Sequence, residues 1–465
     1  MEKKLTLKHR IGYAAGDAGG VMTLILVSYL TRYITNVLEI PYVTLSVLLI
    51  IWNIWDMVND PLVGTLMDKV FEKSPGGKDK FRPWILASIP VMVIGLIAFF
   101  TVPSYLNGMA AVVAIFLLKI VYEWVYTMMN IAMGSLLGAM AVNDTERAAL
   151  SSARGLGSSV GLLAGGVLVP QLLASLGETR SGYMITSIII AILGGIIVFF
   201  HYFWTEERNA DARLVLEDGE ENKVKFTDII NVFKSNRAFL ALSMHSIIIV
   251  FGTFLYTTFS PYMYADVFGD IGMMAYTSVI AQGLSIGLLV IAPTLAKRMG
   301  GTVTLIKACL AIGIILNVAL FAAMMTLDIA PVIFLIVSSV GYGLINMSVQ
   351  LQWGLVSEAI DYNEYLTGKR TEGAIYGTFS LTRRLGQTAA QSLGVLAIGW
   401  IGYNPELTNQ GLSQGSGTIV SIIAMTLVGP AIAAAISWVI FTFIWNIDDE
   451  MRAKISAWRL DRVAK

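Results

Sequence analysis

Two aspartates occur four residues apart inside a long apolar stretch of the chain. The sequence there reads Trp55-Asp-Met-Val-Asn-Asp-Pro61, and a helix would place Asp56 and Asp60 on one face with Asn59 beside them. In a membrane each charge costs at least about 2.5 kcal/mol, and neighbouring carboxylates repel each other. A cation or proton between them relieves that cost, and hard cations prefer oxygen ligands. We therefore predict a cation site here; the alternative is that one aspartate pairs with a basic residue such as Arg384 to hold helices together.

Other charges also lie in apolar surroundings. Lys119 and Glu123 are four residues apart, and this spacing favours a self-neutralising pair within one helix. Asp17 follows a glycine and precedes two more, so it belongs either to a substrate pathway or to a region of close helix packing. Arg383 and Arg384 are adjacent, and on a helix at most one of them is expected to face an interior cavity.

The composition sets the class of protein. The chain has 465 residues, of which 56% are hydrophobic and 14% charged, whereas soluble proteins carry roughly 25% charged residues. A single cysteine excludes a scaffold of disulfides within the chain, and 32 basic residues against 32 acidic ones argue against nucleic acid as a partner. The sequence contains no H-E-x-x-H zinc-protease motif and no P-loop motif. We expect a membrane protein that is not an enzyme and holds no cofactor.

Twelve apolar runs are long enough to cross a bilayer, which takes about 20 residues. They lie at 11–35, 42–67, 84–104, 109–138, 156–176, 183–204, 238–264, 272–295, 302–325, 331–355, 373–402 and 418–446. The longest polar interruption divides them into six and six. We predict an all-α membrane protein with an N-terminal half at 1–204, a central loop at 205–237, a C-terminal half at 238–447 and a tail at 448–465.

The basic residues predict the orientation. When the connections are numbered alternately, one side receives 26 of the 32 Lys and Arg residues and the other side receives only Arg180. Loops rich in Lys and Arg stay in the cytoplasm. We therefore expect a multi-pass protein of the plasma membrane with both termini and the central loop in the cytoplasm.

Several motifs carry a family resemblance over nearly the whole chain. They are Tyr13…Gly16-Asp17, Trp55-Asp-Met-Val-Asn-Asp-Pro61, Gly64…Asp68-Lys69 with Lys80-Phe-Arg-Pro-Trp84, Asp361-Tyr-Asn-Glu-Tyr365 and Gly368-Lys-Arg-Thr-Glu-Gly373. In this order and at these spacings, the chain resembles the glycoside–pentoside–hexuronide:cation symporters of the major facilitator superfamily. The resemblance implies two six-helix halves that rock around a central cavity.

The resemblance also implies a ligand set for the coupling ion. Matched motif to motif, the cation ligands of the melibiose carrier, a member of this family, fall on Asp56, Asn59, Asp60 and Thr127, and all four residue types suit Na⁺. Similar carriers use H⁺, so both ions remain open. No other metal is implied.

The substrate residues match less completely. The resemblance places Tyr126, Asn130 and Arg154 near the sugar, and Ser380 and Arg384 on the eleventh span near the cation site. Asn130 replaces an aspartate of the melibiose carrier, and a second aspartate falls at Gly20 or Ala18, depending on the register. These departures point away from a galactoside. Asp17 joins this set as a candidate, and Trp353 offers either a stacking face for a sugar ring or a packing contact.

The expected function is secondary active transport. A Na⁺ or H⁺ gradient would drive symport of a sugar or glycoside into the cell, with the carrier working as a monomer in the lipid bilayer. Two alternatives remain: a cation-coupled carrier of a non-sugar amphiphile such as a lysolipid, and a membrane sensor built on a transporter fold.

Overall fold

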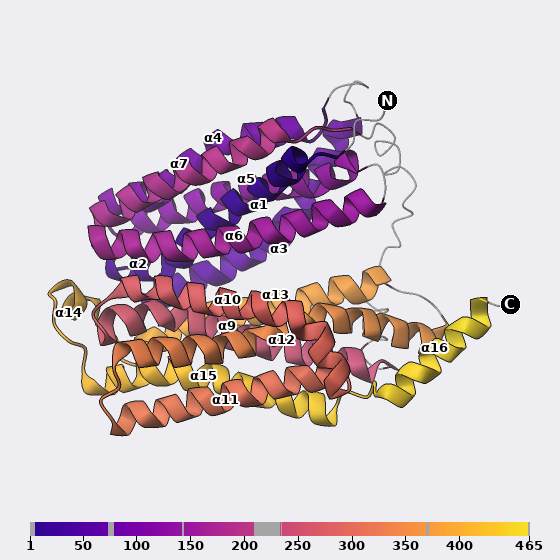
Figure 1. Cartoon of the computed structure of the whole chain (residues 1–465). Helices are drawn as coiled ribbons and strands as arrows, with labels where there is room; N and C mark the ends of the chain where they lie inside the picture. Colours follow the sequence, from indigo (N-terminus) through magenta and orange to yellow (C-terminus); the bar gives the residue numbers. More distant parts are fainter. Residues whose placement is uncertain are drawn as a thin grey trace. The chain divides into compact units, whose positions relative to one another are not determined.

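The protein is all-helical, as its apolar runs predict. The computed structural model describes residues 5–72, 79–141, 144–208, 233, 235–368 and 372–463, and these contain helices and no strand (Figure 1). The chain divides into two compact units. The first holds residues 1–220, 269–279 and 404–412, and the second holds residues 221–268, 280–403 and 413–465. The boundaries predicted from the sequence remain predictions, and most of the expected central loop lies outside the described residues.

Each unit is built from long helices. The first unit contains α1 (Leu7–Ser28), α2 (Leu30–Asn36), α3 (Tyr42–Glu72), α4 (Arg82–Thr101), η1 (Val102–Tyr105), α5 (Met109–Met140), α6 (Asp144–Leu176), α7 (Arg180–Trp204), η4 (Ile271–Met273) and α14 (Pro405–Asn409). The second contains α9 (Arg237–Tyr262), η3 (Met263–Val267), most of α10 (Met274–Met299), α11 (Thr302–Thr326), α12 (Pro331–Thr367), α13 (Glu372–Trp400), α15 (Ser416–Phe443) and α16 (Asp449–Val463).

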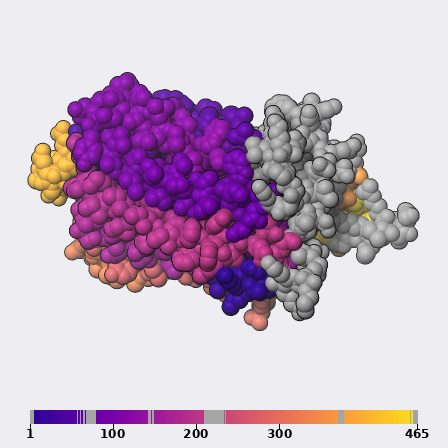
Figure 2. Space-filling view, turned by 90° about the horizontal axis from the view of Figure 1, so that it is seen from above, coloured from indigo at the N-terminus to yellow at the C-terminus, as the bar shows by residue number. Residues whose placement is uncertain are grey.

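The helices have the length and composition of membrane spans. Ten helical segments of the described residues are long and apolar enough to cross a membrane. The other two predicted spans, at 42–67 and 373–402, correspond to α3 with 31 residues and α13 with 29, both longer than the ~20 residues that a bilayer requires. Large apolar side chains remain exposed on the outer surface, and α7 alone exposes Ile192, Ile196, Phe199 and Phe203. Figure 2 shows one side of this surface.

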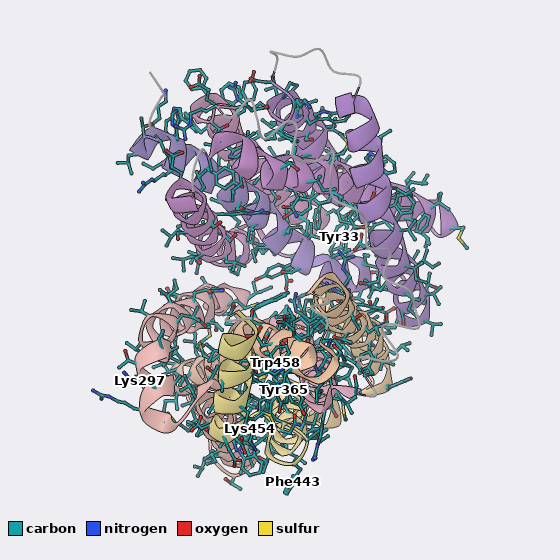
Figure 3. The ribbon with its side chains drawn as sticks, turned by 90° about the vertical axis from the view of Figure 1, so that its right-hand side faces the viewer. Tyr33, Lys297, Tyr365, Phe443, Lys454 and Trp458 are labelled. Atoms are coloured by element: carbon teal, nitrogen blue, oxygen red, sulfur yellow. The ribbon has the colours of Figure 1, made fainter. Side chains whose placement is uncertain are left out.

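Three helices extend beyond the predicted apolar runs. α6 begins at Asp144, so Arg154 lies inside a helix although the predicted apolar run begins only at residue 156. α12 continues to Thr367 and includes the Asp361–Tyr365 motif. The predicted tail forms α16, whose Trp458 ring meets Tyr365 edge-on at 5.8 Å between centroids (Figure 3). These ends have amphipathic patterns, and packing on one face offsets their polar residues, which a search for apolar runs does not detect.

Two stripes of glycine hold α1 tightly between its neighbours. A Cβ added at Gly161 of α6 would lie 2.5 Å from the carbonyl oxygen of Ala18, and Gly157 and Gly165 approach α1 in the same way. On α1 itself, Gly12, Gly16 and Gly19 face α7. Small residues spaced four apart let helix backbones approach closely. The glycines around Asp17 therefore serve packing, which fixes the depth and rotation of α1.

We expect Gly161→Ala to push α1 away from α6, because the new methyl group meets main-chain atoms that cannot rotate aside. Overpacking of this kind costs about 1–3 kcal/mol and should lower the melting temperature of the protein in detergent. Gly155→Ala is the matched control on the same helix, since a Cβ there meets nothing within 4 Å. Equal melting temperatures for the two variants would contradict the close-packing argument.

The buried charge of Arg32, in the first unit, is neutralised by an ion pair with Glu178. Arg32 on α2 is 1% exposed, and its Nε and Nη2 donate to the two carboxylate oxygens of Glu178 at 2.5 and 2.7 Å. This two-pronged geometry is the strongest form of an arginine–carboxylate contact. Arg32 thus has a structural role in joining α2 to the α6–α7 connection.

Candidate cation and substrate site

Two of the predicted cation residues, Asn59 and Thr127, meet between α3 and α5. Asn59 is fully buried, and its Nδ2 donates a hydrogen bond to Oγ1 of Thr127 at 2.9 Å. Asp56 lies one turn earlier on α3 and is half-buried. The backbone of residue 60 continues the same helix, so the spacing of the two aspartates is helical as predicted, but the Asp60 side chain lies outside the described residues.

One oxygen of this group has no hydrogen-bond partner among the described residues. Oδ1 of Asn59 is buried and accepts no hydrogen bond from any described residue. Such an atom costs about 1–3 kcal/mol when it is left unsatisfied. It lies on the same amide whose Nδ2 bonds to Thr127, and Asp56 supplies negative charge one turn away. This combination of amide, hydroxyl and carboxylate oxygens suits a hard cation, so the residues present fit the predicted ion.

Lys119 and Glu123 form the intrahelical ion pair that their spacing predicts. Their side chains are only 12% and 14% exposed, and on α5 they precede the cation residue Thr127. The field of the Asp56 carboxylate also acts on the Lys119 ammonium. The pair is therefore not isolated from the cation residues, a connection that spacing within one helix does not reveal.

A second polar group joins α1, α5 and α6. Asp17 is 8% exposed, and its Oδ2 accepts from Nε of Arg154 at 2.6 Å. Nη2 of the same arginine donates to Oδ1 of Asn130 at 2.7 Å. Tyr126 lies one turn before Asn130 and within the electrostatic field of both Asp17 and Arg154. Three of the predicted substrate residues thus meet in one hydrogen-bonded network, and Tyr126 lies within its electrostatic field.

Gly20 and Ala18, the two positions considered for the missing aspartate, have different neighbours in the structure. A Cβ added at Gly20 would lie 3.1 Å from the methyl carbon of Met129 and 3.5 Å from the Tyr126 ring. Ala18 instead packs against Gly161 in the α1–α6 contact. Gly20 therefore faces the Tyr126 side of α5, and in this chain the tyrosine ring lies where an acidic side chain at position 20 would project.

The remaining predicted substrate residues belong to the second unit. Trp353 on α12 meets Phe379 edge-on at 5.3 Å, and the guanidinium of Arg383 lies over its ring at 5.1 Å. Trp353 thus makes the packing contact that the sequence left open beside a stacking role. Ser380 and Arg384 lie one turn apart on α13 and are half-buried. Residue spacing missed the contact of Arg383 with Trp353, because the two residues lie on different helices.

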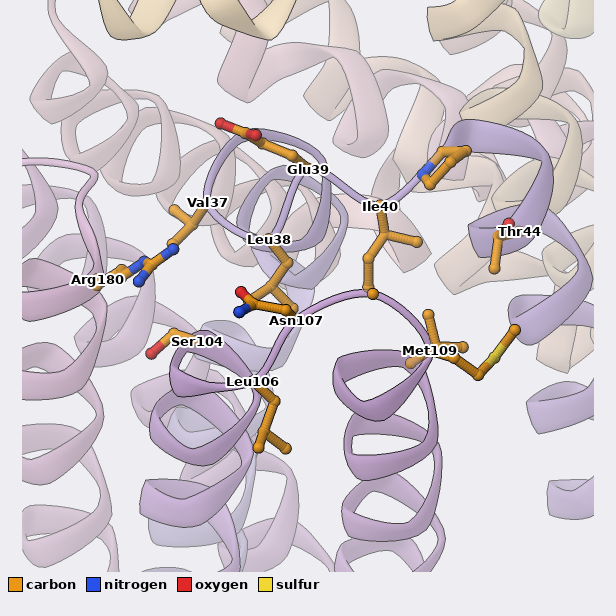
Figure 4. A pocket seen from close by; sticks show the side chains of 13 residues that line it. Val37, Leu38, Glu39, Ile40, Thr44, Ser104, Leu106, Asn107, Met109 and Arg180 are labelled. Carbon is orange, nitrogen blue, oxygen red and sulfur yellow. The ribbon is translucent and has the colours of Figure 1, made fainter.

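Two other features lie apart from these residues. His201 and His245 are fully buried: Nδ1 of His201 donates a hydrogen bond to the carbonyl oxygen of Gly12, and Nδ1 of His245 shares one with the hydroxyl of Ser437. No group of three metal-ligating side chains occurs among the residues that the structure describes. A cavity of about 450 Å³ lies between the α2–α3 and η1–α5 connections and Arg180 (Figure 4). None of the predicted site residues lines it.

Comparisons with known proteins identify the family of the chain. The model of the family described as MFS/sugar transport protein matches residues 12–449. The uncharacterized symporter YjmB of Bacillus subtilis is 28% identical, over 98% of this chain and 95% of the relative. The glucuronide carrier protein homolog of Escherichia coli is 25% identical, over 87% of this chain and 86% of its own length.

A solved structure supports the fold. The crystal structure of the nucleoside transporter NupG superposes with a TM-score of 0.63 over 96% of this chain and all of that one, at 14% sequence identity. These relatives and neighbours are membrane transporters and not enzymes. The chain, a multi-pass transporter with the major facilitator fold, therefore belongs to the MFS/sugar transport protein family.

Proposed function

We propose that the protein is a secondary active transporter that couples the inward movement of Na⁺ or H⁺ to symport of a sugar or glycoside. One observation carries this proposal. Thr127, which bonds to Asn59, and Asn130, which bonds to Arg154, lie three residues apart on α5. One turn of α5 therefore carries both a predicted cation ligand and a predicted substrate residue. Occupancy of one site thus bears on the other.

The coupling ion would bind to Asp56, Asn59, Asp60 and Thr127. Asp56 and Asp60 supply the charge, and the orphaned carbonyl oxygen of Asn59 supplies a neutral ligand. Binding would remove the repulsion between the carboxylates and fix α3 against α5. Either Na⁺ or H⁺ satisfies this requirement, and we propose no cofactor beside the ion.

The sugar would bind to the network of Asp17, Arg154 and Asn130. Sugar hydroxyls both donate and accept hydrogen bonds, and these three side chains offer a carboxylate acceptor, a guanidinium donor and an amide that does both. Tyr126 would provide an aromatic flank, and Trp353, Ser380 and Arg384 remain candidates for further contacts with the substrate. The relatives named as a glucuronide carrier homolog and a symporter support a sugar-type substrate.

Coupling would follow from linkage between the two sites. An ion that raises sugar affinity must have its own affinity raised by sugar to the same extent. The loaded carrier would then open to the cytoplasm by a rocking motion of its two halves. In this proposal the carrier works as a monomer in the plasma membrane, with both termini in the cytoplasm.

Uptake into membrane vesicles tests the proposal. Labelled glycosides, pentosides and uronides are offered in turn under an imposed Na⁺ gradient, an imposed H⁺ gradient or neither. We expect at least one sugar to accumulate only when a gradient is present, and to exchange across the membrane without one. If no sugar is taken up or exchanged, the sugar substrate is wrong, and the same assay with a labelled lysolipid then tests the amphiphile.

A further inference from the structure

A charged stripe on α5 leads directly to the cation residues. Lys119, Glu123 and Thr127 are spaced four residues apart, so their side chains follow one face of the helix. Lys119 and Glu123 form an ion pair with little exposure to solvent, and Thr127 bonds to Asn59 of α3. The stripe therefore runs from an ion pair to Thr127, one of the predicted cation ligands, over about two turns of the helix.

An aromatic side chain of α3 lies beside the ammonium group of Lys119. The Trp52 ring lies 5.7 Å from Nζ of Lys119, and Trp55 stacks on Trp124 of α5 at 6.1 Å between centroids. Asp56 follows one turn after Trp52, and its field reaches Lys119. The ammonium thus pairs with the Glu123 carboxylate on its own helix and lies within the electrostatic field of the Asp56 carboxylate on the neighbouring helix.

Glu123 does not use its full hydrogen-bonding capacity. Its Oε2 is buried and has no hydrogen-bond partner among the described residues. A buried ion pair is stabilised when further hydrogen bonds satisfy its remaining atoms, and that support is lacking here. The arrangement therefore suits an ammonium, that of Lys119, which interacts with both Glu123 and Asp56. It suits a purely structural ion pair less well.

We propose that Lys119 and Glu123 set the affinity of the cation site: the Lys119 ammonium attracts Asp56 in competition with the coupling ion, and Glu123 limits this competition by holding the ammonium on α5. The inference rests on the proposed cation site and adds two residues that do not ligate the ion. Because water is largely excluded from this region, the charges interact more strongly than they would at a surface.

The two single substitutions should act in opposite directions. Lys119→Gln removes the competing charge, and we expect Na⁺ affinity to rise about tenfold, or to become measurable if the unmodified protein shows no response. Glu123→Gln releases the ammonium towards Asp56 and should lower Na⁺ affinity about tenfold. The double variant should return to within about threefold of the unmodified protein. The readout is the Na⁺ concentration that half-maximally stabilises the full-length purified protein against heat, with choline as the ionic control.

A matched control makes the same substitutions in an ion pair elsewhere in the chain. Glu450 and Lys454 form an exposed i,i+4 pair on α16, with Nζ and Oε1 2.6 Å apart. Glu450→Gln and Lys454→Gln should leave the Na⁺ response within twofold of the unmodified protein. A purely structural role for Lys119 and Glu123 predicts lower stability in both single variants without opposite shifts in Na⁺ affinity, and that result overturns the proposal.

If one of the single variants is not produced as folded protein, a variant that exchanges the two charges tests the proposal. Lys119→Glu/Glu123→Lys keeps both charges but moves the ammonium about 6 Å along the helix towards Thr127. Na⁺ affinity should then fall about tenfold, and an unchanged affinity rejects the inference. Failure of the proposed function is distinguishable, because it appears as gradient-driven uptake that survives Asp56→Asn. Failure of this inference alone leaves that substitution inactive while the Lys119 and Glu123 variants respond to Na⁺ like the unmodified protein.

Discussion

Asp56→Asn is expected to lower gradient-driven uptake at least about a hundredfold, which corresponds to about 2.7 kcal/mol. The substitution keeps the size of the side chain and removes the charge. Asn59 and Thr127 are neutral, so without Asp56 fewer negative groups remain to compensate a cation for its lost water. Asp60→Asn should have an effect of the same kind, since the sequence places both acids on one face of α3.

The assay for Asp56 separates coupling from substrate binding. Uptake driven by a Na⁺ or H⁺ gradient should be lost, whereas exchange of sugar at equal concentrations on both sides should persist at a reduced rate. Asp449→Asn on α16 is the control, because it makes the same chemical change at a side chain that is 79% exposed. Gradient-driven accumulation by the Asp56→Asn protein would rule out this carboxylate as part of the coupling site.

The second large effect is expected at Arg154. Its guanidinium holds Asp17 and Asn130 through different nitrogens, at 2.6 and 2.7 Å. Arg154→Gln should reduce sugar uptake about a hundredfold, because both contacts are lost and the nearly buried Asp17 is left without its partner. Removal of one partner from a fully buried pair costs about 3–5 kcal/mol. The Arg154 side chain is 33% exposed, so we expect a smaller stability loss of about 2 kcal/mol.

Two further variants separate charge from geometry at this position. Arg154→Lys keeps the charge but lacks the planar fork that reaches two acceptors, and uptake should fall about tenfold. The double variant Arg154→Gln/Asp17→Asn should regain the melting temperature without regaining uptake. Arg298→Gln, at an exposed arginine near the end of α10, is the control. Normal uptake by Arg154→Lys would show that charge alone suffices.

The helices were predictable because they depend on local sequence. Apolar runs of sufficient length give nearly the same bounds as α5 or α11, and the helical spacing of Lys119 and Glu123 correctly gave their ion pair. The errors lie at amphipathic ends. α6 and α12 begin or end in polar sequence, and those turns are stabilised by packing that an apolar run does not record.

The candidate site was only partly predictable. The family motifs named Asp17, Asn130 and Arg154, but not that one guanidinium bridges the other two side chains. The contact between Arg383 and Trp353 was not predicted, because adjacency to Arg384 said only that the two arginines diverge. Likewise, the sequence allowed two registers for the missing aspartate, and it did not reveal that Gly20 lies beside Tyr126 and Met129.

The amino-acid sequence by itself determined that this is an all-helical membrane transporter of a sugar-transport family, because span length, charge scarcity and motif order are properties of the chain alone. Only the tertiary structure decided which polar atoms meet: Asn59 with Thr127, Arg154 with Asp17 and Asn130, and Lys119 with the field of Asp56. The physical reason is that such contacts depend on the rotation and depth of each helix. For α1, these are fixed by the glycine contacts with α6 and α7, which involve residues more than a hundred positions apart.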